Sequence, residues 1–141
     1  MEKYLVDRDV TVFCVQVESF PLGIMDAYQK LHALLPTSEL RNFYGVSNVN
    51  SKKVIIYKAA VEELYEREAQ KYSCETYTIR MGEYIGMGIT DFRKTPQSIS
   101  KAFEKVLANP NINPHGACIE QYLNDTDVKC IVRLESTKNN R

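Results

Sequence analysis

A carboxylate and a phenol two residues apart are the side chains of this chain best suited to chemistry. Glu120 and Tyr122 stand in the short apolar run 117–123, whose length and composition are typical of a strand. Because successive side chains of a strand point to opposite faces, Glu120 and Tyr122 share one face and Ile119 lies on the other. Such a pair can bind a cation, or serve as general base and acid in a hydrolysis.

The strand that follows supplies the expected partner of Glu120. Residues 124–127, Asn-Asp-Thr-Asp, are typical of a tight hairpin turn. If the turn centres on its first two residues, Glu120 lies nearly opposite Lys129. Two interpretations stay open. The two residues form a solvent-facing ion pair, or they belong to a buried binding site in which Glu120 needs a partner.

Tyrosine is used heavily, with nine Tyr against five Phe. Tyr44, Tyr57 and Tyr84 lie on predicted strands, and Met87 follows Tyr84 on the same strand. A tyrosine offers an apolar face with a polar end, which suits an amphipathic ligand or a cation, and Met87 offers a pliable wall. Ordinary half-buried strand tyrosine and core methionine are the alternative interpretations.

No metal or cofactor is expected. The sequence has no Gly-rich phosphate loop and no nucleophile elbow. Its cysteines form no C-x-x-C pair and have no histidine at metal-ligand spacing. They are expected to be buried free thiols, with two disulfides as the alternative: Cys14, Cys74, Cys118 and Cys130.

Two similar strand–helix–strand–strand units are predicted to position these side chains. Residues 21–33 align without a gap on residues 96–108, and Pro, Ile, Ala, an aromatic, Lys and Ala recur in register. Pro21 and Thr95-Pro96 are expected to start the two helices. The predicted elements are strands 10–17, 42–48 and 53–59 with helix 21–35, then strands 76–80, 84–90, 117–123 and 128–134 with helix 96–108.

The fold class expected from this pattern is α+β, with duplicated units, an antiparallel or mixed sheet, two paired helices and a central groove. The halves would span about 8–60 and 76–135. The charged stretch 61–75, which includes Glu68, is expected to be a solvated linker with a helical turn or two.

Bulk properties exclude several classes of protein. The 141 residues fit one domain. Eighteen Lys and Arg balance eighteen Asp and Glu, so the chain lacks the excess positive charge that is typical of nucleic-acid-binding proteins. No apolar run approaches the roughly 20 residues that span a bilayer, and the charged N-terminus lacks a signal-peptide core. A cytoplasmic location without membrane binding is therefore expected.

The order and spacing of these elements resemble the GyrI-like effector-binding domain, which also forms the ligand-binding part of bacterial transcription activators. The resemblance covers residues 1–135. It is carried by the run 77–84, the helix start Thr95-Pro96, and Cys118-Ile119-Glu120-Gln121-Tyr122. It implies pseudo-symmetric halves with a groove that binds amphipathic, often cationic, organic molecules. It also implies that Glu120 is the pocket carboxylate and Tyr122 its neighbour.

The chain departs from the family pattern on its last strand. Many members carry a second acid, an aromatic residue and a proline where this sequence has Lys129, Ile131 and Arg133. The family pocket is also often rich in Trp, which this chain lacks. These departures put the family's usual preference for cations in doubt.

The function expected from the resemblance is a stand-alone small-molecule-binding protein, a sensor or a sequestering protein. It would have no DNA-binding segment of its own, and it would act alone, with a protein partner or as a homodimer. Some relatives are hydrolases of electrophilic cyclopropane-type compounds, so an alternative is an enzyme that uses Glu120 and Tyr122. A third hypothesis is an inhibitor or adaptor that binds another protein.

Overall fold

The computed structural model describes residues 1–36 and 40–135. The chain divides into two compact units. Unit 2 is the continuous segment 9–79, and unit 1 combines residues 1–8 with the chain from residue 80 onward. No helix in the described ranges is long and apolar enough to cross a membrane.

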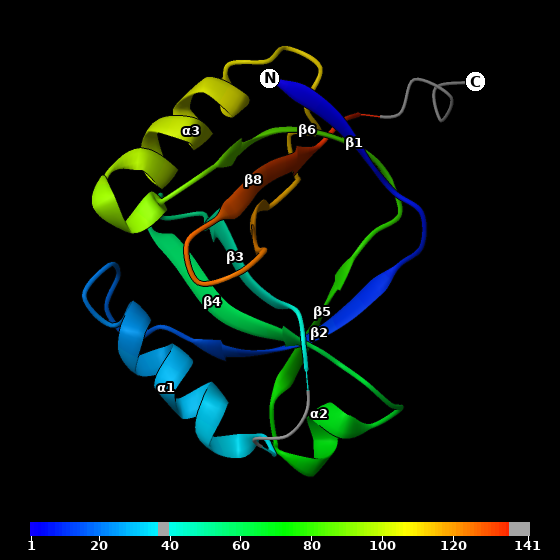
Figure 1. Cartoon of the computed structure of the whole chain (residues 1–141). Coiled ribbons are helices and arrows are strands. Elements are labelled where there is room, and N and C mark those ends of the chain that lie inside the picture. The colour runs from blue at the N-terminus through cyan, green and yellow to red at the C-terminus, as the bar shows by residue number, and fades with distance from the viewer. Residues whose placement is uncertain (37–39, 136–141) are drawn as a thin grey trace. The chain divides into compact units, whose positions relative to one another are not determined.

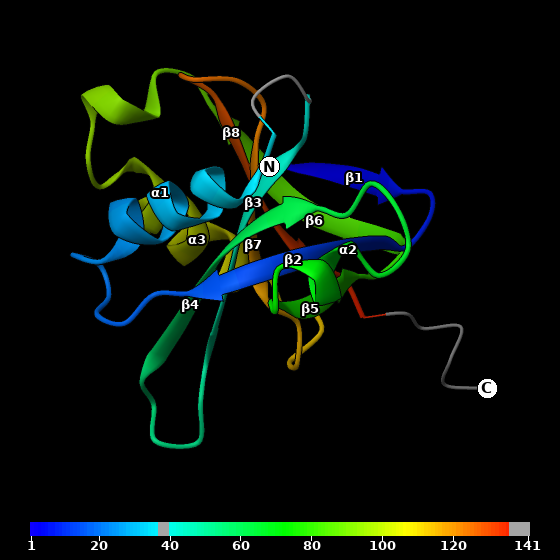
Figure 2. The same ribbon diagram turned by 90° about the horizontal axis from the view of Figure 1, so that it is seen from below.

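Unit 2 is a four-stranded antiparallel sheet with one long helix. Its strands lie in the order β3-β4-β2-β5, and helix α1 packs on β2 and β4 (Figure 1). Figure 2 shows the β3–β4 hairpin extending past β2, which pairs only with residues 58–62 of β4. The elements are β2 (Val10–Gln16), α1 (Ile24–Leu34), β3 (Phe43–Val49), β4 (Ile55–Glu62), α2 (Glu68–Lys71) and β5 (Glu75–Ile79).

Unit 1 is also a four-stranded antiparallel sheet with one long helix. Its strands lie in the order β1-β6-β8-β7, and helix α3 packs on β6 and β8 (Figure 1). The elements are β1 (Glu2–Val6), β6 (Gly82–Ile89), the 3₁₀ turn η1 (Phe92–Lys94), α3 (Ser98–Leu107), β7 (Cys118–Tyr122) and β8 (Val128–Arg133).

Each unit has its own apolar core under its helix. In unit 2, Ala27 and Leu31 of α1 meet buried residues of β2 and β4. In unit 1, Ala102 and Val106 of α3 meet buried residues of β6 and β8. The helix spacing of apolar side chains in the sequence predicts both contacts. The α+β class with antiparallel strands is confirmed, whereas the duplication itself stays a prediction.

Two strands differ from the prediction. The sequence pattern does not predict β1, because its charged sequence lacks the apolar alternation of a half-buried strand. Among the described strands β1 pairs with β6 alone, and charged side chains are typical of an edge strand. The sequence places β5 in the second half, whereas in the structure it pairs with β2 and lies in unit 2.

Both long helices begin later than predicted. α1 begins at Ile24, three residues after Pro21, because the chain first makes a turn in which the Gly23 N–H donates to the Ser19 carbonyl at 2.6 Å. α3 begins at Ser98 with Gln97 as its N-cap residue. Thr95 instead ends η1 in an extended conformation, so it does not cap α3.

One strand glycine is required by close packing. A Cβ atom at Gly86 would lie 2.1 Å from the Cys130 carbonyl oxygen, so no side chain fits there. The strand pairing of β6 with β8, and hence the placement of the β7–β8 hairpin, depends on this glycine.

Candidate functional site

The β7–β8 hairpin has a different register from the one predicted. Glu120 lies opposite Cys130, and Gln121 lies opposite Lys129. The predicted pairing of Glu120 with Lys129 is therefore wrong by one residue. Because side chains alternate along a strand, this shift places Lys129 on the face of the sheet opposite to Glu120.

The turn explains the shift. The Leu123 N–H donates to the Asp127 carbonyl at 3.0 Å, so the loop contains three residues and centres on Asp125. The Asn124 side-chain oxygen accepts hydrogen bonds from the N–H groups of Thr126 and Asp127, at 2.8 and 2.9 Å. An asparagine that bonds to the backbone ahead of it stabilises such a turn locally.

Glu120 and Tyr122 are directly bonded to each other. The Tyr122 hydroxyl donates to Glu120 Oε1 at 2.5 Å, a length typical of a hydrogen bond to a charged oxygen. Glu120 is only 7% exposed. Tyr122 is half-buried and packs on the core under α3, so the pair lies on the face of the unit 1 sheet that carries the helix.

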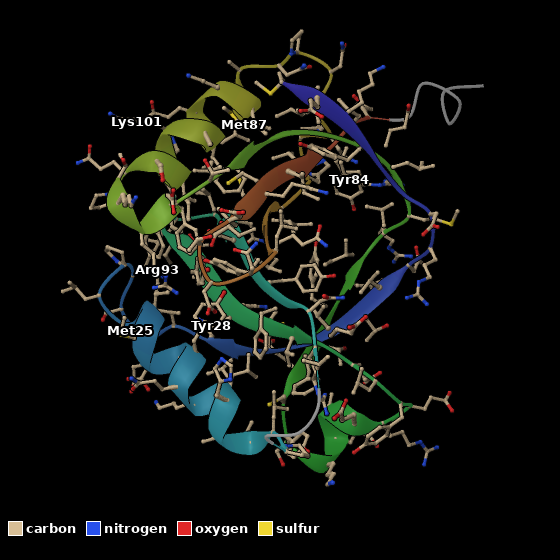
Figure 3. All side chains as sticks on the ribbon, viewed as in Figure 1. Met25, Tyr28, Tyr84, Met87, Arg93 and Lys101 are labelled. Carbon is tan, nitrogen blue, oxygen red and sulfur yellow. The ribbon has the colours of Figure 1, made fainter. Side chains whose placement is uncertain are left out.

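Met87 shares this face. It lies opposite Cys130 on β8, which in turn lies opposite Glu120 on β7, so the three form one row across the sheet. Figure 3 shows Met87 directed toward α3, and Met87 packs on the apolar core there. The structure therefore brings Glu120, Tyr122 and Met87 together in unit 1, and we call these three residues the Glu120 cluster.

Phe92 in η1 lies against the Glu120 cluster, a contact that the sequence pattern does not predict. Its ring centroid lies 5.6 Å from that of Tyr122. The Arg93 guanidinium carbon lies 5.1 Å from the Phe92 centroid, so this ring already contacts a cation. The only signal in the sequence is a single aromatic residue in the polar segment between β6 and α3.

The thiols near Glu120 are poor nucleophiles at neutral pH. Burial, together with the charge of Glu120, raises the pKa of Cys118 to about 11. Burial, Glu120 and Cys118 raise the pKa of Cys130 to about 12. Both thiols therefore stay protonated at neutral pH. All four cysteines are free, as expected, but only Cys14 and Cys130 are fully buried.

Tyr84 and Lys129 lie on the other face of the unit 1 sheet. Tyr84 is 2% exposed, and its hydroxyl donates to the Arg80 carbonyl at 2.7 Å. Lys129 Nζ lies 4.4 Å from the centroid of the Tyr4 ring. Neither residue shares a face with Glu120.

Tyr44 and Tyr57 belong to unit 2 and lie on opposite faces of its sheet. Tyr57 is in the core under α1, and its hydroxyl lies 3.0 Å from that of Tyr28. The Tyr28 hydroxyl donates to the Tyr44 carbonyl at 2.7 Å, and Figure 3 shows Tyr28 pointing inward from α1. These hydroxyl groups therefore join α1 to the sheet.

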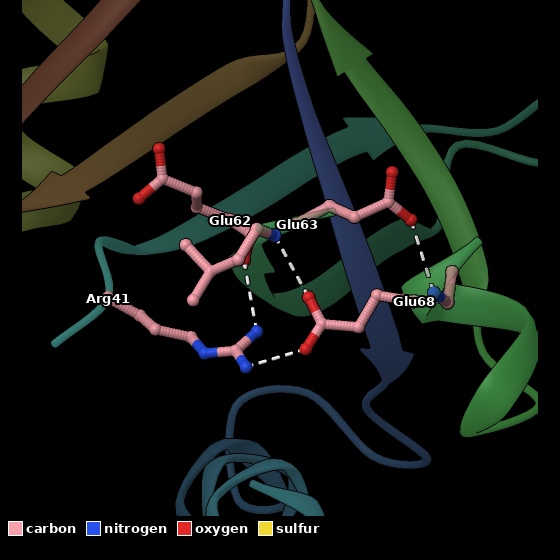
Figure 4. A network of polar contacts seen from close by, with 6 residues as sticks. Arg41, Glu62, Glu63 and Glu68 are labelled. Carbon is pink, nitrogen blue, oxygen red and sulfur yellow. Dashed lines mark hydrogen bonds and ion pairs between the residues drawn. The ribbon is translucent and has the colours of Figure 1, made fainter. Parts of the chain in front are cut away.

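Unit 2 contains a second buried carboxylate, Glu68 of α2, which is 0% exposed. Arg41 Nη2 lies 2.6 Å from Glu68 Oε2, and the Leu64 N–H donates to Glu68 Oε1 at 2.9 Å (Figure 4). Arg41 also donates to the Glu62 carbonyl at 3.4 Å. The expectation that Glu68 is solvated is therefore wrong, because this ion pair fastens α2 to the sheet.

The surroundings of Glu68 set its protonation. Burial raises its pKa, but hydrogen bonds from Arg41 and Leu64 and the positive charges of Arg41 and Lys71 lower it, and the balance holds the pKa below its ordinary value. Glu68 is therefore an ionised structural group. In the described part of the chain, no group of His, Cys, Asp and Glu could hold a metal ion.

No family model and no curated protein sequence matches this chain. Solved structures share its fold. An integron cassette protein from the mobile metagenome of Vibrio cholerae has a TM-score of 0.65 at 17% identity, over 95% of each chain. The protein SAV2435, solved bound to tetraphenylphosphonium, has a TM-score of 0.64 at 11% identity, over 100% of this chain and 98% of its own.

A hydrolase from Listeria innocua has a TM-score of 0.58 at 12% identity, over 95% of this chain and 90% of its own. At these identities the likeness establishes the fold alone. Membership of the GyrI-like family therefore stays a prediction.

Proposed function

We propose that this chain binds an amphipathic organic cation at the Glu120 cluster and acts as a sensor or sequestering protein. The observation that carries the proposal is the buried Glu120 carboxylate with its short hydrogen bond from Tyr122. The proposal uses three of the predicted site residues, Glu120, Tyr122 and Met87. Roles for Tyr44, Tyr57 and Tyr84 in ligand binding stay predictions.

The chemistry of the cluster favours this class of ligand. A carboxylate in apolar surroundings is costly unless a positive charge or hydrogen-bond donors compensate it. The aromatic rings of Tyr122 and Phe92 offer faces that attract cations, and Met87 adapts to irregular apolar shapes. A ligand with a delocalised positive charge and apolar substituents would satisfy all of these groups.

The structural neighbours support the proposal. Tetraphenylphosphonium, the molecule bound to SAV2435, is an organic cation with four apolar rings. A protein with this fold therefore accommodates the kind of ligand that the Glu120 cluster would select.

Titration with tetraphenylphosphonium tests the proposal. We expect wild-type protein to bind it and Glu120→Gln to bind it about tenfold more weakly, a change of about 1.4 kcal/mol. The matched control is Glu104→Gln, which removes an exposed acid from α3 in the same unit and should leave the affinity unchanged. Equal affinities of the wild-type and Glu120→Gln proteins, both folded by thermal melting, would contradict the proposal.

A hydrolase is the second candidate function. One structural neighbour is described as a hydrolase, and the bonded pair Glu120 and Tyr122 has the groups needed for a general base and a general acid. In this reaction the water oxygen would form a bond to a cyclopropane carbon while Glu120 takes its proton. One C–C bond of the ring would break, and Tyr122 would protonate the carbon or oxygen that receives the electron pair of that bond. Incubation with an electrophilic cyclopropane substrate should then give a hydrolysed product that Glu120→Gln and Tyr122→Phe do not form.

A further inference from the structure

The face of the unit 1 sheet opposite the Glu120 cluster carries a row of three residues with different properties. Gly88 on β6 lies opposite Lys129 on β8, and Lys129 lies opposite Gln121 on β7. The row therefore places an ammonium group between a residue without a side chain and a carboxamide. We call these residues the Lys129 row.

Lys129 is a half-buried cation whose contact is an aromatic ring. Its Nζ lies 4.4 Å from the centroid of Tyr4, which is on β1 of the same unit. Within the described residues, no ion pair or hydrogen bond involves the Lys129 ammonium. Glu2 is the acid on the same face of β1, opposite Gly86, and it is exposed. A lysine ammonium has three donors, so this group has capacity for an anionic acceptor.

Space is available beside Lys129. A Cβ atom at Gly88 would meet no other atom within 4 Å, and Gly88 is exposed. Gln121, directly across from Lys129, has a carboxamide with two donors and one acceptor. A carboxylate placed over Gly88 would therefore find the Lys129 ammonium on the neighbouring strand, with the Tyr4 ring beside that ammonium for an apolar group.

We propose that the Lys129 row, with Tyr4, is a second binding site, and that it takes small organic anions in which a carboxylate is attached to a flat apolar group. The carboxylate would bind the Lys129 ammonium above Gly88, and the apolar group would pack on Tyr4. This site lies on the face opposite Glu120, and it does not rest on the cation-binding function proposed above.

Calorimetric titration with 2-naphthoate at low ionic strength tests this site, with neutral 2-naphthamide as the matched probe. We expect naphthoate to bind wild-type protein at least about fivefold more tightly than naphthamide, and Lys129→Met to abolish that preference. Lys129→Arg keeps the charge and should keep the preference. The affinity for naphthoate should fall as salt is added.

A second variant tests the position of the site without changing charge. Gly88→Val adds a β-branched side chain into open space on a strand, so the protein should fold and lose naphthoate binding at least about tenfold. Glu120→Gln should bind naphthoate as the wild type does. The proposal is overturned if wild-type protein does not bind naphthoate, or if Lys129→Met or Gly88→Val binds it as tightly as wild type.

Discussion

The two buried carboxylates of this protein are compensated in different ways. Among the described residues, Glu68 in unit 2 and Glu120 in unit 1 are the buried carboxylates. Glu68 is bonded to the Arg41 guanidinium at 2.6 Å and to a backbone N–H. Glu120 accepts a 2.5 Å hydrogen bond from the Tyr122 phenol.

The charge of the partner makes Glu68 a structural group, whereas Glu120 has a neutral partner that it can exchange. If Glu68 left Arg41, two opposite charges would lose their compensation in a buried site, which is strongly unfavourable. If Glu120 left Tyr122, the phenol would stay neutral and could bond elsewhere. Separation of Glu120 from Tyr122 is therefore less costly than separation of Glu68 from Arg41.

The largest expected effect is the loss of stability on breaking the Arg41–Glu68 ion pair. Arg41→Met should lower the free energy of unfolding by about 3–5 kcal/mol, because it leaves the Glu68 charge buried without its guanidinium. Urea denaturation followed by circular dichroism measures the change. The double variant Arg41→Met with Glu68→Leu should recover most of the loss, and a double variant no more stable than Arg41→Met would contradict this account of the pair.

Removal of the Tyr122 hydroxyl should lower the free energy of unfolding by a smaller amount. Tyr122→Phe takes one hydrogen bond from Glu120 and should cost about 1–3 kcal/mol. In the Glu120→Gln background the same substitution should cost less, because a neutral amide needs the donor less than a carboxylate does. A double-mutant cycle from urea denaturation measures this coupling, and a coupling of zero would show that the bond contributes no stability.

The two carboxylates should also differ in their response to acid. The folded-state pKa of Glu68 is lowered, so the stability it contributes is fully present above the unfolded value of about 4.3 and is lost as the pH falls through the folded pKa. Urea midpoints between pH 6 and pH 3 should therefore fall more for the wild type than for the Arg41→Met, Glu68→Leu double variant. If the urea midpoints of the two proteins fell in parallel with pH, Glu68 would not be the source of the acid sensitivity.

The smallest expected effect reports the charge of Glu120. The pKa of Cys118 is raised to about 11, mainly because the thiol is buried and to a smaller extent because of the Glu120 charge. Glu120→Gln should lower that pKa slightly, and Cys118 should react somewhat faster with iodoacetamide at pH 9–10. Mass spectrometry of the labelled peptide measures the rate. An unchanged rate would contradict a contribution of the Glu120 charge to the pKa of Cys118.

Local sequence patterns predicted the elements better than their pairing. β-branched runs and helical spacing gave approximate positions for the predicted strands and both long helices. The hairpin register was missed because it depends on Asn124, whose side chain makes a three-residue loop instead of a two-residue one. Bonds from the segment before α3 also hold this turn, since the Phe92 N–H donates to the Thr126 carbonyl at 2.9 Å and Arg93 donates to the Asp125 carbonyl at 2.9 Å.

Long-range contacts account for the other failures. The burial of Glu68 depends on Arg41, 27 positions earlier in the chain, so the local charge pattern of residues 61–75 suggested a solvated linker instead. Phe92 acquires its role only because η1 places it against Tyr122. The pairing of Glu120 with Tyr122 on one face was predicted from strand alternation alone, because that property needs no distant contact.

The path of the chain through unit 1 has a consequence for synthesis on the ribosome. β1 emerges first, but its partner β6 follows only after the whole of unit 2. Unit 2 is one uninterrupted segment, so every strand partner within it is present as soon as residue 79 has left the exit tunnel. Unit 1 needs both the beginning of the chain and residues 82–133. The nascent protein can therefore complete the unit that holds the Arg41–Glu68 ion pair before the Glu120 cluster has left the exit tunnel.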